Sequence, residues 1–280
     1  MNTGFKIPIC CLSAFFFAPW FAGAGESEHK KEEVQHKKSA DPVQVKESPP
    51  PGETVRFPWD LDRDYRFSWI KGRTKVGETR FRISEVEAPT GSSVKKAFRC
   101  SSSYWYKTEG FSQEGKHETW FDREWKPLRY TCRHQMSGIR NTRALQEQEG
   151  RISNGLLVLG VIHNGDSKNG VESRMEAPSD GYLLQNQAFD NWAVLTGQIL
   201  RQRPAAMDAR IIYPDLVKVY EVRFTFEKEE PIDLGKPEKP ICRSYSFRSK
   251  EGQFTGKLWT DGKGRMIQYQ QGELRIALEE

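Results

Sequence analysis

Two histidines of this 280-residue chain could do metal chemistry, because they fall on the two arms of one predicted hairpin. His117 and His134 could therefore lie near each other. No carboxylate or cysteine stands at metal-ligand spacing around them, and the run His117-Glu118-Thr119-Trp120 lacks the second histidine of an H-E-x-x-H motif. We expect ordinary surface histidines here, and the sequence predicts neither a metal site nor a cofactor.

Nucleophile and phosphate-binding motifs are absent from the sequence. It contains no G-x-S-x-G turn, no P-loop and no G-x-G-x-x-G segment that opens a helix. The run Ser101-Ser102-Ser103 belongs to a predicted strand, and nothing in the sequence places a base beside it. We therefore expect a protein that is not an enzyme.

An acidic and aromatic cluster leaves one enzymatic alternative open. Asp60, Asp62 and Asp64 stand beside Trp59 and Tyr65, and paired carboxylates hydrolyse glycosides without any short motif. A carbohydrate-active enzyme is therefore a third hypothesis. The simpler interpretation is a solvated strand start, with aromatic side chains that fill the core of a sheet.

The N-terminus predicts a signal peptide over residues 1–24. Lys6 supplies a positive start, residues 7–21 form a short apolar run, and Ala22-Gly23-Ala24 is a cleavage motif with cutting between Ala24 and Gly25. An uncleaved anchor is the alternative. No second apolar segment approaches the length of a membrane span, so we expect no transmembrane segment in the mature chain. The predicted location is outside the cytoplasm, periplasmic or extracellular.

Three cysteines remain after the predicted cleavage. Cys100 and Cys132 fall on inward faces of predicted strands, so a disulfide between them is possible in an oxidising compartment. A simple meander places one strand between them, which is too far for a disulfide, and two buried free thiols are the alternative. Cys242 falls on the opposite side of its strand from Tyr245 and Phe247, so we expect it to face outward.

The organisation after the signal peptide changes once. Residues 25–54 combine lysine and glutamate runs with a proline-rich end, and such a segment buries too little apolar surface to order itself. We predict a disordered linker there and a single β-rich domain over residues 55–280. Net charge is +5, and no basic stripe or recognised motif accompanies it, so no nucleic acid is expected.

Alternating aromatic residues predict strands through most of this domain, as in residues 57–70 and 75–86. Residues 140–152 read as a strand that faces solvent on both sides, and residues 155–162 as one buried on both faces. Residues 185–200 break the pattern, because apolar residues recur there at helical spacing. The prediction is a mainly β fold, a long curved antiparallel sheet or half-barrel wrapped around one apolar helix.

Two strand-turn-strand segments carry a resemblance to a known family. They are YRFSWIKG at residues 65–72, followed by Val76-Gly77-Glu78, and LWTDGKGRMIQY at residues 258–269. In these segments the chain resembles the half-barrel domains of periplasmic lipoprotein carriers and related, mostly uncharacterised, envelope proteins. The resemblance covers most of residues 57–278. It implies an apolar concavity that holds acyl chains, with no catalysis, and it transfers no individual contact residue.

The leading hypothesis is an exported, non-enzymatic binding domain for a lipid, an acyl chain, another apolar ligand or an exported partner. Its ligand would lie between sheet and helix, against Tyr65, Phe67, Trp69, Phe81, Phe98, Tyr104, Phe189, Trp192, Leu195 and Ile199. The second hypothesis is a structural or protein-interaction component of the cell envelope. In that case the helix fills the sheet as core and no ligand cavity exists.

Overall fold

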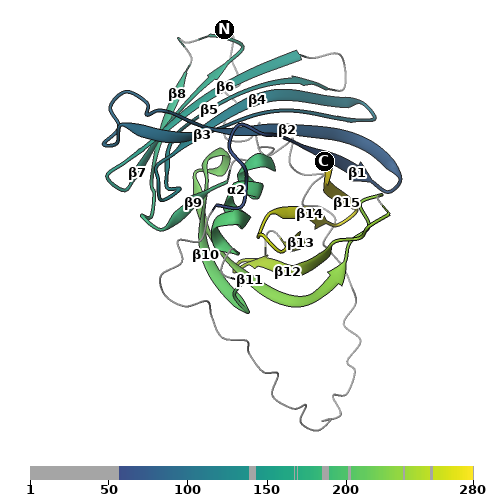
Figure 1. Ribbon diagram of the computed structural model, residues 1–280. Coiled ribbons are helices and arrows are strands. Elements are labelled where there is room, and N and C mark those ends of the chain that lie inside the picture. Colours follow the sequence, from purple (N-terminus) through teal and green to yellow (C-terminus); the bar gives the residue numbers. More distant parts are fainter. Residues whose placement is uncertain are drawn as a thin grey trace. The chain divides into compact units, whose positions relative to one another are not determined.

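A long antiparallel sheet dominates the computed structural model of this chain (Figure 1). The structure describes residues 57–138, 143–166, 168, 170–184, 189–200, 203–235, 237–252 and 255–279. All of them belong to one unit, Arg56–Glu280. The predicted signal peptide over residues 1–24, its cleavage between Ala24 and Gly25, and the predicted linker over residues 25–54 lie outside the described residues.

Eight strands follow one another along the first half of the sheet, and each pairs with the next in the antiparallel sense. They are β1 (Asp64–Lys71), β2 (Thr74–Glu87), β3 (Lys96–Thr108), β4 (Phe111–Phe121), β5 (Pro127–Ser137), β6 (Arg143–Ser153), β7 (Leu156–His163) and β8 (Val171–Glu176). The predicted first hairpin is confirmed, and Gly72 closes its turn with a positive φ of 60°.

The second half of the sheet continues from the other side of β1, which pairs with β15. Its strands are β9 (Gly181–Leu183), β10 (Ala206–Tyr213), β11 (Lys218–Pro231), β12 (Ile241–Ser249), β13 (Thr255–Thr260), β14 (Met266–Gln271) and β15 (Leu274–Glu279), with a 3-10 helix, η2 (Pro214–Leu216), between β10 and β11. The short β9 pairs with β10 in parallel. A parallel pair needs a crossover, and helix α2 (Phe189–Ile199) provides it.

The sheet bends around α2. The helix contacts β2, β9 and β14, which stand far apart in the strand order. It also reaches β4, where Thr119 Oγ1 donates to Asn191 Oδ1 at 3.3 Å. A flat sheet could not bring these strands to one helix. The predicted fold class, a mainly β chain with a curved antiparallel sheet around one helix, is therefore confirmed.

Helix α2 is buried on nearly every side. Ala193 and Leu195 point to nearly opposite sides, because the helix turns by about 200° over two residues. Each of the two is nevertheless at most 1% exposed. Gly197 lets another segment approach closely, because a Cβ there would lie 2.8 Å from Pro58 Cγ. The adjacent Trp59 donates from Nε1 to the carbonyl oxygen of Ala193 at 3.1 Å. The helix thus packs as core inside the curve of the sheet.

One buried cluster joins strands from the two ends of the sheet. Leu157 and Leu159 of β7 pack in it with Leu183 of β9 and Ile212 of β10. Strand β7 lies next to one edge and β9 forms the other, and among the described residues no backbone ladder joins β8 to β9. Side-chain packing therefore draws the ends together, while the ladder stays open.

Two expectations about the middle strands are wrong. Strand β6 does not face solvent on both sides, because Gln148 and Gly150 are buried. Strand β7 is not buried on both faces, because Leu157 and Leu159 are buried while the residues between and beside them stay partly exposed. Both strands lie near an edge of the sheet, where only one face is covered.

The strand position of Cys242 predicted a side chain that faces outward, and this prediction is wrong. Its side chain is 0% exposed. Alternation does place it opposite Tyr245 and Phe247, but both faces of the sheet are covered in this region. The consecutive residues Leu258 and Trp259 on the neighbouring β13 are both buried. Strand parity therefore does not identify a solvent side here.

Candidate functional site

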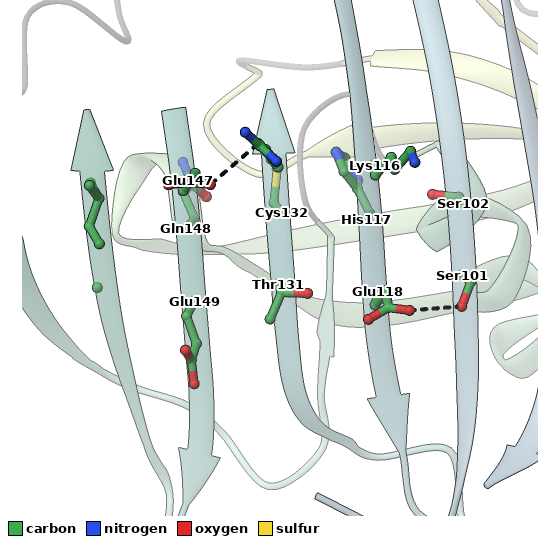
Figure 2. A pocket seen from close by; sticks show the side chains of 13 residues that line it. Ser101, Ser102, Lys116, His117, Glu118, Thr131, Cys132, Glu147, Gln148 and Glu149 are labelled. Carbon is green, nitrogen blue, oxygen red and sulfur yellow. Dashed lines mark hydrogen bonds and ion pairs between the residues drawn. The ribbon is translucent and has the colours of Figure 1, made fainter. Parts of the chain in front are cut away.

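Five neighbouring strands, β3 to β7, line a pocket of about 570 Å³ (Figure 2). Because alternate residues point to opposite sides of a sheet, the strand registers sort the lining residues onto two faces. One face carries Ser101, Lys116, Glu118, Thr131, Arg133, Glu147, Glu149, Gly160 and Ile162. The other face carries Ser102, His117, Cys132 and Gln148.

Charged side chains form two neighbouring rows on the first face. Lys116, Arg133 and Glu147 lie opposite one another in one row, and the ion pair between Arg133 Nε and Glu147 Oε1 measures 3.3 Å. Glu118 and Glu149 belong to the next row. Among the described residues Lys116 forms no ion pair. We call these two rows the charged rows. They place positive and negative groups within one pocket.

The second face of the same strands is buried. Ser102, His117, Cys132 and Gln148 lie opposite one another on four strands, and each is buried. His134 lies two residues beyond Cys132 on β5 and therefore on the same face. His117 is 1%, Cys132 4% and His134 3% exposed. We call these three residues the buried polar cluster.

The buried polar cluster has the composition of a metal site. One potential ligand atom from each of its residues lies within 4.8 Å of those of the other two. Cys132 Sγ hydrogen-bonds to His134 Nε2, and the rings of His117 and His134 stand perpendicular with their centroids 5.0 Å apart. Neither ring nitrogen of His117 has a hydrogen-bond partner among the described residues, nor has Oγ of Ser102, which lies opposite it.

Tyr104 orients the ring of His134. The Tyr104 hydroxyl hydrogen-bonds to His134 Nδ1 and accepts a hydrogen bond from Gln113 Nε2 at 2.9 Å. Gly115 stands between Tyr104 and His134 in the register. A Cβ on Gly115 would lie 2.6 Å from Tyr104 Cε1. The absence of a side chain at this position therefore lets the tyrosine ring cross β4.

Burial controls the charge of both imidazoles. It lowers the pKa of His134 to about 4. Burial also lowers the pKa of His117 well below its usual range, and the nearby His134 lowers that pKa further. Both rings are therefore uncharged at neutral pH, which is the form of histidine that binds metal ions.

The structure overturns what was expected of these histidines. His117 and His134 are core residues and not surface residues, and they meet a thiol that no standard motif had linked to them. The available signal was Cys132-Arg133-His134 on one strand, because residues two apart on a strand share a face. His117 also stands opposite Ser102, although no hydrogen bond joins the two side chains.

The side chains expected to line an apolar cavity belong to the core. Most of them are buried, namely Tyr65, Phe67, Trp69, Phe81, Tyr104, Trp192, Leu195 and Ile199. Phe98 is partly exposed and stacks on Trp125 at 4.5 Å, and the side chain of Phe189 lies outside the described part of the chain. The described ones do not line the pocket over β3–β7. Their contact with an apolar ligand stays a prediction.

The disulfide considered between Cys100 and Cys132 is not formed. Both residues are buried and outside any disulfide, as is Cys242. Strand β4 lies between β3 and β5, so the two cysteines are separated by two strand spacings, about 9–10 Å. A disulfide spans at most about 7 Å between Cα atoms.

The acidic residues near the start of β1 are engaged at the surface. Asp64 forms an ion pair with Arg82 at 2.5 Å and Asp60 one with Arg63 at 3.5 Å. Neither aspartate lines the pocket. They therefore contribute nothing to the site over β3–β7.

Comparison with known proteins finds no family and two distant structural matches. No family model and no curated protein matches the chain. A β-barrel-like protein of the domain of unknown function DUF1849 from Brucella abortus matches with a TM-score of 0.46 and 8% identity, over 77% of this chain and 93% of that one. A DUF1089 family protein from Pseudomonas aeruginosa matches with a TM-score of 0.41 and 12% identity, over 69% of this chain and 89% of that one.

The strand order by itself defines the class of the protein. The chain is a mainly β domain built on one open sheet. The narrower resemblance to lipoprotein carriers stays a prediction. Within the described residues, no helix has the length and apolar character needed to cross a membrane.

Proposed function

We propose that this chain is an exported, non-enzymatic binding domain that holds a small zwitterionic headgroup in the pocket over β3–β7. The observation that carries the proposal is the pair of charged rows. A ligand with one cationic and one anionic group can pair with both rows, and charge-assisted hydrogen bonds are about twice as strong as neutral ones. The volume of about 570 Å³ falls in the range of small-molecule sites, roughly 300–1,000 Å³.

The border of the pocket supports an amphipathic ligand. Gly160 and Ile162 of β7 extend the charged rows on the same face. They offer an apolar edge beside Glu147 and Glu149, where a glycerol backbone or the start of an acyl chain would lie. A zwitterionic phospholipid is therefore the member of this ligand class that we propose, in keeping with the lipid ligand expected from the sequence.

The charged rows allow a direct binding test. Short-chain phosphatidylethanolamine, used below its micelle concentration, should bind the purified chain in calorimetry, and Lys116→Ala and Arg133→Ala should each weaken that binding. Lys250→Ala, a change of an exposed lysine in the turn after β12, is the matched control and should have no effect. Absence of binding, or equal loss in the control, contradicts the proposal.

The proposed export rests on the pattern of residues 1–24. Cell fractionation of the full chain in a Gram-negative host should place it outside the cytoplasm. Its intact mass should be that of a chain that begins at Gly25. A cytoplasmic protein that retains Met1 contradicts export. This outcome is independent of the binding test, so the two parts of the proposal can fail separately.

A structural or interaction role in the cell envelope is the second candidate, and the burial of α2 on nearly every side favours it. Because helix α2 already packs as core inside the curve of the sheet, no acyl chain is needed to complete that core. Native mass spectrometry of the purified protein distinguishes the two, since a structural protein should carry no copurifying lipid. Pull-down with and without residues 25–54 then tests whether the linker recruits a partner.

A further inference from the structure

We propose that His117, Cys132 and His134 bind a single copper ion as Cu⁺ on the buried face of the sheet. The three donor side chains point to the face opposite the charged rows, although His117 and Cys132 also border the pocket. The proposal does not depend on the function proposed for that pocket. The inference rests on their donor atoms, the unsatisfied polar atoms beside them and the hydrogen bonds that orient them.

The donor set selects the ion. One thiolate and two imidazoles form a soft N₂S set, which suits Cu⁺ or Zn²⁺ and disfavours Mg²⁺ and Ca²⁺. Two observations separate copper from zinc. The cluster has three donors, whereas structural zinc almost always takes four protein ligands. A thiolate also neutralises Cu⁺ completely but leaves Zn²⁺ with a net positive charge, which is costly in a buried site.

Unsatisfied polar atoms lie beside the three donors. Both nitrogens of His117 and the hydroxyl of Ser102 are buried, lie opposite each other and have no hydrogen-bond partner among the described residues. An unpaired polar group in the core destabilises the folded chain. Because the His117 ring is almost fully buried next to Cys132 and His134, an ion held by all three would satisfy one of its nitrogens.

The surroundings already orient the donors. In the tautomer with a proton on Nδ1, His134 donates to the Tyr104 hydroxyl, which also accepts from Gln113 Nε2. The lone pair of His134 Nε2 then points toward Cys132 Sγ. Metal-binding histidines almost always donate their second ring nitrogen in this way. Tyr104 and Gln113 are therefore positioning residues for the proposed site.

Binding is a simple exchange. The thiol of Cys132 loses its proton to solvent, Cu⁺ forms one bond to that sulfur and one to a nitrogen of each histidine, and the net charge inside the sheet is unchanged. No electron is transferred. The ligand atoms all lie within 4.8 Å of one another. Cys132 Sγ and His134 Nε2 are 2.5 Å apart, so these two atoms would separate by roughly 1 Å to hold one ion between them, judged from typical metal–ligand distances.

Competition with a coloured Cu⁺ chelator tests the proposal. The full chain, kept reduced and free of oxygen, is equilibrated with the Cu⁺ complex of bicinchoninate, added either to folded protein or during refolding. We expect one equivalent of Cu⁺ to pass to the protein, and excess Zn²⁺ not to displace it. Failure of the wild-type chain to take up Cu⁺, or displacement by Zn²⁺, overturns the proposal whatever the variants do.

Matched variants locate the ion. Cys132→Ser and His134→Gln should lose the uptake, whereas Cys100→Ser, a buried thiol two strands away, and His163→Gln should keep it. Near-ultraviolet circular dichroism of each variant establishes that it folds. Uptake that survives in folded Cys132→Ser, or that disappears in folded Cys100→Ser, overturns the assignment.

Discussion

The hydroxyl of Tyr104 on β3 reaches His134 Nδ1 on β5, across the full width of β4. The ring passes over Gly115, where a Cβ would lie 2.6 Å from Tyr104 Cε1. This hydrogen bond therefore requires a tyrosine on β3, a glycine on β4 and a histidine on β5 in one row of the register. The strand register thereby determines the geometry of the buried polar cluster.

Tyr104→Phe should weaken Cu⁺ binding without abolishing it. The three proposed ligands remain, but His134 loses the partner that fixes its ring and its tautomer. Loss of such a partner typically weakens metal affinity about 10- to 100-fold. The chelator competition measures the change, and Tyr106→Phe, a change of a half-buried tyrosine on the same strand, is the control. Equal affinity in wild type and Tyr104→Phe would show that Tyr104 does not position His134.

Gly115→Ala should destabilise the fold by displacing the ring of Tyr104. Overpacking a filled site typically costs about 1–3 kcal/mol of unfolding free energy. The control is Gly160→Ala on β7, where a Cβ would have no neighbour closer than 3.9 Å. Urea unfolding should show a loss for Gly115→Ala and little change for Gly160→Ala. If both variants lose the same stability, the cause is strand propensity and not the crossing of Tyr104.

Several features of the fold follow from the sequence, but the central feature of the site does not. Alternation predicted correctly that Tyr65, Phe67 and Trp69 share a face, because a single strand determines it. The meeting of His117 with Cys132 depends on the register between β4 and β5, which a turn and a bulge at Trp120/Phe121 fix. A single strand holds no information about that offset.

Burial was the second property that local patterns could not supply. The segment that forms β6 looks polar, yet Gln148 is buried because its neighbours across the sheet belong to the core. Cys242 shows the same limit, since both faces of its sheet are covered. The helix was easier to predict, because the apolar residues of α2 recur within a short stretch of chain.

Leu195→Ala distinguishes a packed core from a ligand cavity around α2. A fully packed leucine loses about 2–5 kcal/mol of unfolding free energy on truncation, and Leu195 is 1% exposed. Leu216→Ala, at an exposed leucine in η2, should change stability by less than about 0.5 kcal/mol. A loss for Leu195→Ala no larger than that of the control would favour an apolar cavity beside the helix.

Glu78→Gln should reduce the dependence of stability on acid pH. Burial raises the pKa of Glu78, but hydrogen bonds from Lys75 and Arg80, at 2.9 and 2.6 Å, outweigh it and lower that pKa below its ordinary value. The stabilisation is therefore complete above the unfolded-state pKa of about 4.3. It disappears as pH falls through the lower folded-state pKa.

Urea unfolding at pH 7 and at pH 3 measures this contribution of Glu78. The wild-type chain should lose more unfolding free energy between the two conditions than Glu78→Gln does. Glu273→Gln, at an exposed residue in the turn before β15, should behave as wild type. An identical pH dependence in all three proteins would show that Glu78 does not contribute to the loss of stability in acid.

X-ray absorption at the copper edge of the loaded full chain tests the central claim most directly. The buried polar cluster predicts one sulfur and two nitrogen neighbours around a three-coordinate Cu⁺ in the wild-type chain. A shell of nitrogen and oxygen alone would contradict a copper site built from His117, Cys132 and His134.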